Sequence, residues 1–223
     1  MGKFALSISV HLLTASGVVF ALWSFVLMQS GDAAGSLYFL AAAAAIDSVD
    51  GALARLVDVK KHTPHIDGAL LDNLVDYLTW TFAPLFWAWL FLDVPFAVCA
   101  VAAISSLFGF SHQQAKTEDH FFRGFPSYWN LLVFYLFVLQ AAPWASSTLI
   151  IACAILVLVP VKFIYPSRTP VWRKTTLLLA IPYSILLVVL LIHLDESPLW
   201  VTLASFYYPV YYVVLSFMVS GRK

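Results

Sequence analysis

Residues 33–55 read AAGSLYFLAAAAAIDSVDGALAR, and residues 68–91 read GALLDNLVDYLTWTFAPLFWAWLF. Each run is long enough to cross the roughly 30 Å of bilayer hydrocarbon as a helix that rises about 1.5 Å per residue. Each run also carries two aspartates near the polar connection that joins them: Asp47, Asp50, Asp72 and Asp76. Because the connection is short, we expect both acidic ends to lie at the same surface of the membrane.

The composition of the whole chain is that of a membrane protein. Of its 223 residues, 62% are apolar and 11% are charged, and the mean hydropathy is +0.89. An ordinary soluble domain is about 45–50% apolar and about 25% charged. The 12 basic and 12 acidic residues cancel, so no excess of positive charge attracts nucleic acid. The composition therefore predicts an integral membrane protein with no nucleic-acid partner.

Polar breaks divide the chain into about eight apolar segments. They predict an all-α fold of about eight transmembrane helices, because only helices and closed barrels span a bilayer. No connection is long enough for a soluble domain, so we expect residues 1–223 to form a single membrane domain. The expected spans are residues 4–28, 33–54, 68–91, 94–113, 127–142, 146–165, 174–193 and 198–219.

The charged residues predict how these helices are oriented. When the connections are assigned alternately to two sides, all 12 basic residues fall on the side that holds both termini. The other side carries acidic residues alone: Asp32, Asp93, Asp195 and Glu196. Basic residues collect in cytoplasmic loops, so we expect cytoplasmic N- and C-termini. The four aspartates of the two quoted runs then lie at the cytoplasmic surface.

Those four aspartates have the spacing of helix faces. Asp47 and Asp50 are three residues apart and Asp72 and Asp76 are four apart, so each pair shares one face. Four carboxylates that converge at a membrane surface repel one another and lose hydration. Divalent cations with oxygen ligands remove both costs, and a pair of such ions stabilises phosphoryl displacement. The pattern predicts two divalent cations, and an all-carboxylate site suits Mg²⁺ or Mn²⁺.

The residues around the aspartates resemble the signature of the CDP-alcohol phosphotransferase family, membrane enzymes that make phospholipid headgroup linkages. The signature covers residues 47–76 here. Its eight positions are filled by Asp47, Asp50, Gly51, Ala54, Arg55, Gly68, Asp72 and Asp76. The twelve residues between Arg55 and Gly68 make a longer gap than is usual in the family.

The longer gap resembles that of the bacterial phosphatidylcholine synthase branch of the family. Two further stretches are similar to the same branch, AKTEDHFFRGFPSYWN at residues 115–130 and YPSR at residues 165–168. The resemblance implies an enzyme of the bacterial inner membrane that joins choline to CDP-diacylglycerol, giving phosphatidylcholine and CMP on the cytoplasmic side. Family members are often homodimers, and the small residues of the second to fourth spans permit such packing.

The resemblance also implies roles for individual residues. The four aspartates would hold two cations, with Mn²⁺ favoured over Mg²⁺, and Asp76 would also accept the proton of the choline hydroxyl. Lys116 and Arg168 are phosphate candidates that serve equally well as positive-inside anchors. The residues expected to bind CDP-diacylglycerol are Gly51, Ala54, Arg55, Gly68, Lys116 and Arg168.

Choline is a quaternary ammonium ion, which aromatic faces recognise and a nearby carboxylate supports. The candidates are Tyr128, Trp129, Glu118 and Tyr77. Tyr128 and Trp129 begin the predicted fifth span, and Tyr77 follows Asp76 directly. Because 16% of the chain is aromatic, each ring can equally belong to helix packing or to the aromatic belt of a membrane protein.

Two other functions compete with choline transfer. The same chemistry could use another acceptor alcohol, such as glycerol phosphate, serine or inositol, although a phosphorylated acceptor needs extra basic residues near the aspartates. The chain could also be an ion-coupled transporter that uses acids within the membrane. Against the transporter, the acids gather at one surface, whereas transporter sites lie near the bilayer midplane on discontinuous helices.

Overall fold

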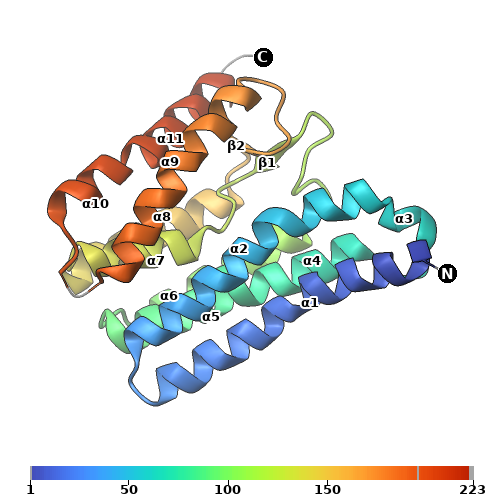
Figure 1. Cartoon of the computed structure of the whole chain (residues 1–223). Coiled ribbons are helices and arrows are strands. Elements are labelled where there is room, and N and C mark those ends of the chain that lie inside the picture. The colour runs from blue at the N-terminus through green and yellow to red at the C-terminus, as the bar shows by residue number, and fades with distance from the viewer. Residues whose placement is uncertain (1, 195, 221–223) are drawn as a thin grey trace. The chain divides into compact units, whose positions relative to one another are not determined.

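The computed structural model shows a chain that is helical over most of its length (Figure 1). It describes residues 2–194 and 196–220. Three charged residues of the predicted topology, Asp195, Arg222 and Lys223, lie outside the described residues. The expected helical fold is confirmed, with the addition of one pair of short strands.

The chain forms two compact units. The first unit comprises Met1–Asp93 together with Trp129–Val133, and the second comprises Val94–Tyr128 together with Phe134–Lys223. Helix α7 (Trp129–Val138) therefore contributes residues to both units. Both acidic runs of the sequence belong to the first unit, so the aspartates and the helices that carry them can be described within one unit.

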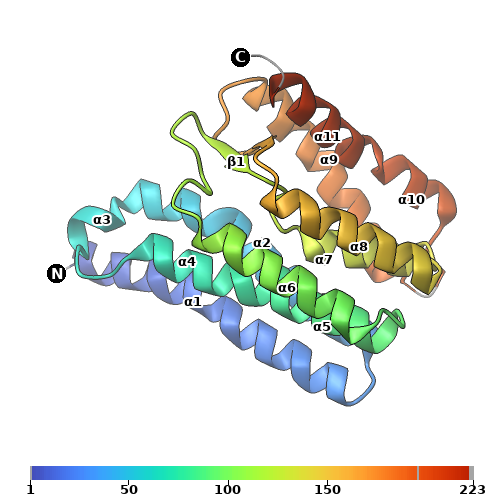
Figure 2. The same ribbon diagram turned by 180° about the vertical axis from the view of Figure 1, so that it is seen from behind.

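The first unit begins with an antiparallel helix pair. α1 (Gly2–Gln29) and α2 (Ala33–Val57) lie side by side in both views (Figures 1 and 2). In the turn between them Gly31 has a φ of 81°, which glycine adopts without strain. The Asp32 carboxylate caps α2 by accepting the Gly35 N–H at 2.8 Å. The first two predicted helices are thus confirmed, and α2 extends slightly further than expected.

A second helical run follows in the first unit. A polar connection with the short helix α3 (Val59–His62) precedes it, and Asp67 caps its start by accepting the N–H groups of Ala69 and Leu70. The run consists of α4 (Gly68–Asp76), the π-helical segment η1 (Tyr77–Phe82) and α5 (Ala83–Phe91). A π-helix has hydrogen bonds between residues five apart, one residue more than in an α-helix, and is often found at functional sites. Here it begins directly after Asp76.

The second unit consists of helices and one pair of short strands. Its other elements are α6 (Phe96–Ser111), β1 (Phe121–Arg123), α8 (Pro143–Leu158), β2 (Lys162–Ile164), α9 (Arg173–Ile192), α10 (Leu199–Ser205) and α11 (Tyr207–Ser220). α6 packs against α8, where the Ser105 hydroxyl donates to the Ala154 carbonyl. α9 packs against α10, and the Tyr207 hydroxyl at the start of α11 donates to the Leu179 carbonyl of α9.

The predicted sixth helix, residues 146–165, was wrong over its last seven residues. α8 ends at Leu158 and Val159 is extended, because a residue before proline avoids the α conformation and Pro160 has no N–H to donate. The chain then enters β2, which pairs antiparallel with β1. The predicted fifth helix, residues 127–142, is also too long, since α7 covers only Trp129–Val138.

Several helices have the length and composition of membrane spans. Among the described residues, 4 helical stretches of at least 18 residues are apolar enough to cross a bilayer: Gly2–Gln29, Ala33–Val57, Arg173–Ile192 and Leu199–Ser220. α6, α7 and α8 are shorter apolar helices. The chain is therefore a membrane protein by composition and helix length, and the number of eight spans and the cytoplasmic termini stay predictions.

Candidate metal centre

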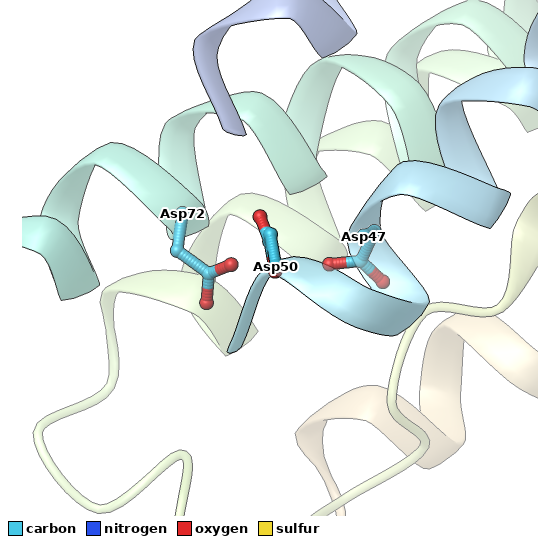
Figure 3. Close-up of side chains that lie close together, drawn as sticks. All are labelled: Asp47, Asp50 and Asp72. Atoms are coloured by element: carbon cyan, nitrogen blue, oxygen red, sulfur yellow. The ribbon is translucent and has the colours of Figure 1, made fainter. Parts of the chain in front are cut away.

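Three carboxylates, two from α2 and one from α4, lie close together. α2 carries Asp47 and Asp50 one turn apart, and α4 carries Asp72 in its second turn (Figure 3). One carboxylate oxygen from each of the three residues lies within 4.8 Å of the other two. Asp50 is the most enclosed, with 4% of its surface exposed, while Asp47 and Asp72 are half-buried. The spacing predicted from the sequence therefore does bring residues of both helices together.

Asp76 lies outside this group of three but borders the same space. It lines a pocket together with Asp47 and Asp50. The other residues that line the pocket are Thr14, Gly17, Ala43, Ile46, Val75 and Thr79. The pocket is thus formed entirely within the first unit, with acidic groups from α2 and α4 and a wall supplied by α1.

α1 makes a polar contact with the aspartates that sequence reasoning missed. The Thr14 hydroxyl donates to Asp50 Oδ2 at 2.6 Å. A threonine in an apolar run usually bonds a carbonyl of its own helix, so its residue type alone does not distinguish Thr14. One weak signal was available, since His11, Thr14 and Gly17 follow one another at intervals of three residues and so share a face of α1.

The arrangement fits a divalent cation. Three ionised carboxylates with oxygens this close repel one another, and the low exposure of Asp50 increases the repulsion because water screens it poorly. Carboxylate oxygens are the preferred ligands of Mg²⁺, Mn²⁺ and Ca²⁺. Asp47, Asp50 and Asp72 can therefore hold a hard divalent cation, as the sequence predicted, and the number and identity of the ions stay predictions.

The other signature residues of α2 lie on the turn after Asp50. Gly51 and Ala54 are half-buried, and Arg55 is exposed near the end of the helix. Arg55 folds back along the helix, because a Cβ placed on Gly51 would lie 3.4 Å from Arg55 Nη1. This separation is close to ordinary van der Waals contact, so Gly51 and the Arg55 guanidinium are neighbours along α2.

Gly68, at the start of α4, lies against α1. A Cβ at this position would lie 3.2 Å from His11 Cε1, so the missing side chain makes room for the imidazole ring. His11 is buried, and its Nε2 lies 3.0 Å from Thr63 Oγ1. This contact ties the long connection between α2 and α4 to α1. The predicted role of Gly68 in substrate binding stays a prediction.

The remaining predicted substrate residues differ in their surroundings. In the second unit, Lys116 and Glu118 are exposed before β1, and the exposed Arg168 has its Cζ 5.8 Å from the centroid of the Tyr165 ring. Tyr128 packs its ring against those of Phe122, Phe125 and Tyr212.

Two candidates belong to the first unit. Trp129 is buried at the start of α7, and Tyr77 opens η1 directly after Asp76. The roles of all these residues stay predictions.

Asp119 has a partner that the sequence did not indicate. Its carboxylate forms an ion pair with the Lys162 ammonium of β2. The hydrogen bond from Lys162, together with one from Thr117, holds the pKa of Asp119 below its ordinary value. Asp119 and Lys162 thus offset each other's charge.

The chain is similar to known proteins. Residues 8–161 match a family model described as CDP-alcohol phosphatidyltransferase. A phosphatidylcholine synthase of Legionella pneumophila is 41% identical over 164 residues, which are 71% of this chain and 64% of that protein. A phosphatidylcholine synthase of Borreliella burgdorferi is 38% identical over 72% of this chain and 70% of that protein. One of Pseudomonas aeruginosa is also 38% identical, over 71% of this chain and 68% of that protein. The chain thus covers slightly less than two thirds of the Legionella protein.

Proposed function

This chain belongs to the CDP-alcohol phosphatidyltransferase family, and we propose that it transfers the phosphatidyl group of CDP-diacylglycerol to choline. The products are phosphatidylcholine and CMP. The observation that carries the proposal is the meeting of Asp47, Asp50 and Asp72 from two helices in a chain that matches this family. The names of the similar bacterial proteins support choline as the acceptor.

Asp47, Asp50, Asp72 and Asp76 hold two divalent cations, Mn²⁺ or Mg²⁺, in this proposal. When bound, the cations neutralise the pyrophosphate of the donor and the charge that develops on the departing CMP oxygen. Three of the ligands are supported by the closeness of their oxygens. Asp76 is supported by its place on the pocket that Asp47 and Asp50 also line.

Asp76 also acts as the general base. The choline hydroxyl oxygen attacks the phosphorus that bears the diacylglycerol, the bond from that phosphorus to the CMP oxygen breaks, and Asp76 takes the hydroxyl proton. Asp76 borders the pocket but lies outside the group of three close carboxylates. A carboxylate on the edge of the group is better able to accept a proton than one surrounded by cations, because nearby positive charge lowers basicity.

Gly51, Ala54 and Arg55 hold the nucleotide end of the donor. Gly51 and Ala54 present little side chain on the turn that follows Asp50, which lets a ligand approach the helix backbone. The exposed Arg55 guanidinium is suited to bidentate contact with phosphate. Gly68 allows close packing at the start of α4. Lys116 and Arg168 are proposed as further phosphate ligands on the basis of the sequence alone.

The choline ammonium is recognised by aromatic and acidic side chains. Tyr77 is the candidate best supported by position, since it follows the proposed base Asp76 directly at the start of the π-helical segment. Tyr128, Trp129 and Glu118 are proposed because aromatic faces and a nearby carboxylate recognise a quaternary ammonium ion. We further propose eight spans with cytoplasmic termini, an active site on the cytoplasmic side of the bacterial inner membrane, and a homodimer.

The decisive experiment is a transferase assay on the purified protein with CDP-diacylglycerol, Mn²⁺ and a panel of labelled alcohols. We expect choline to yield labelled phosphatidylcholine and an equal amount of CMP. Serine, inositol and glycerol phosphate should react poorly. If one of these reacts and choline does not, the acceptor is wrong and the chemistry stands. If no alcohol releases CMP, the proposed reaction is wrong.

A further inference from the structure

The sequence signature covers α2 and α4. The structure shows that a residue of α1 also contacts the cluster formed by Asp47, Asp50 and Asp72. Thr14 lies 36 residues before Asp50, and its Oγ1 approaches Asp50 Oδ2 to 2.6 Å. Asp50 is the most enclosed of the three clustered aspartates, with 4% of its surface exposed. Because water has little access to Asp50, a short hydrogen bond from the protein can determine the orientation of its carboxylate.

The direction of this hydrogen bond follows from the single hydroxyl proton of threonine. Thr14 Oγ1 has two acceptors within reach, the Val10 carbonyl oxygen at 3.4 Å and Asp50 Oδ2 at 2.6 Å. An ionised carboxylate can only accept, and hydrogen bonds to charged groups are the shorter and stronger ones. Thr14 thus donates to Asp50 and holds the rotation of its carboxylate about the χ2 bond.

Contacts on either side keep Thr14 in place. Three residues earlier, His11 Nε2 lies 3.0 Å from Thr63 Oγ1 in the connection between α2 and α4. Three residues later, a Cβ placed on Gly17 would lie 2.6 Å from Val75 Cγ1, so α1 approaches α4 as closely as a glycine allows. α1 is therefore held both before and after Thr14, which keeps the backbone of Thr14 beside Asp50.

We infer that Thr14 is a positioning residue of the metal centre, which sets the orientation of the Asp50 carboxylate for binding a divalent cation. The inference rests on the proposed function, because it takes Asp50 to be a metal ligand. Hydrogen-bond partners of metal ligands orient them, and their removal typically weakens metal binding about 10- to 100-fold. Thr14 would act through Asp50 alone.

The test compares the affinity for Mn²⁺ of three variants of the full chain purified in detergent. Thr14→Val keeps the shape and removes the donor, Thr14→Ser keeps the donor, and Ser16→Ala removes a hydroxyl that bonds the Leu13 carbonyl of the same helix. Mn²⁺ binding is measured by the electron paramagnetic resonance signal of the free ion, without substrate. We expect Thr14→Val to weaken binding about tenfold or more, and both other variants to bind like the unmodified protein.

Transferase activity gives a second reading. The Mn²⁺ concentration for half-maximal activity should rise for Thr14→Val by the same factor as the dissociation constant, and excess Mn²⁺ should restore most of the rate. Equal Mn²⁺ affinity of Thr14→Val and the unmodified protein overturns the inference. An equal loss of affinity in Ser16→Ala or in Thr14→Ser overturns it as well, because the effect would then not depend on the donor.

Two further results separate this inference from the proposed function. If the unmodified protein neither binds Mn²⁺ nor transfers a phosphatidyl group, the proposed function fails and the inference fails with it. If it does both and Thr14→Val is unchanged, only the inference fails. Should Thr14→Val not fold, as judged by its thermal unfolding without metal, Thr14→Ala removes the same hydroxyl without placing a second methyl beside Asp50, and the same criteria apply.

Discussion

Polar residues are held in opposite ways in two regions of the molecule. In the aspartate pocket of the first unit, they project from helices, and Asp50 is held by a side chain of another helix, Thr14. In the strand loops of the second unit, defined as residues 112–128 and 159–172, they lie on short strands and turns held by hydrogen bonds to the backbone. Thr169 is an example, since it donates to the His120 carbonyl and accepts the Tyr165 N–H.

The difference decides how each region responds to a change. A side chain on a helix keeps its place as long as the helices pack. The pocket should therefore lose function only when a reacting side chain is replaced or a helix is displaced. A loop side chain keeps its place through individual hydrogen bonds, so the strand loops should lose local order when one bond is removed. The following predictions test this contrast, beginning with the largest expected effect.

Replacing the proposed base should abolish turnover and leave the fold intact. Asp76→Asn retains the size of the side chain but cannot accept the proton, and loss of general base catalysis typically costs about 10²- to 10⁴-fold in rate. The measurement is the initial rate of phosphatidylcholine formation at saturating Mn²⁺, with thermal unfolding as the check on folding. Asp119→Asn is the matched control and should keep its rate. A rate for Asp76→Asn within threefold of the unmodified protein would falsify the base role.

Displacing α1 should damage the pocket through packing. Gly17→Ala places a methyl group 2.6 Å from Val75 Cγ1, and overpacking of this kind costs about 1–3 kcal/mol of stability. We expect a lower thermal midpoint and a lower rate, because the displaced helix also moves Thr14 away from Asp50. Gly2→Ala is the control, since nothing lies within 4 Å of a Cβ at that position. An unchanged midpoint for Gly17→Ala would show that α1 packs less tightly than the structure indicates.

Removing one hydroxyl should loosen the strand loops. Thr169→Val leaves the His120 carbonyl and the Tyr165 N–H without their partner at a position that is 2% exposed. An unsatisfied buried polar group costs about 1–3 kcal/mol. Hydrogen exchange should therefore rise at residues 117–123 and 162–169 and stay constant in α1 and α2. Thr148→Val, at an exposed site bonded to its own helix, should change neither. Uniform exchange changes across the chain would contradict a local effect.

Breaking the exposed ion pair should have the smallest effect. Lys162→Met removes the partner of Asp119, and exposed pairs of this kind contribute about 0–1 kcal/mol. Because the hydrogen bond from Lys162 lowers the pKa of Asp119 in the folded protein, any stabilisation is present above the ordinary aspartate pKa. It is lost as the pH falls through the lowered pKa. Stability of the variant and the unmodified protein should converge at acid pH, and a difference that grows there instead would refute the pairing.

The sequence predicted best the features that depend on local periodicity. Helical spacing put Asp47 with Asp50 on one face, and the short connection brought Asp72 of the next helix beside them. The end of α8 was missed although Pro160 marks it, because the apolar run continues through Val161 into β2 and hides the break. Apolar content alone does not distinguish a helix end from a buried strand.

The contacts of α1 lay beyond local reasoning. α1 is apolar around most of its circumference, and such a helix carries no pattern that tells which face is turned toward the rest of the protein. From the sequence, His11 is consistent with a packing residue and Thr14 with a hydroxyl that bonds its own helix. Gly17 is consistent with a small, loosely packed residue. Only the partners, Thr63, Asp50 and Val75, give them their roles.

By itself, the sequence determined that this is a helical membrane protein of the CDP-alcohol phosphatidyltransferase family with paired aspartates on two consecutive helices. Hydropathy and helical spacing are properties of one segment at a time, and they can be read without knowing what lies opposite. Only the tertiary structure decided that Asp76 borders the pocket outside the close group of three, and that Thr14 bonds Asp50. The rotation and depth of one helix against another depend on both surfaces at once, so the local sequence does not show which residues 36 positions apart will meet.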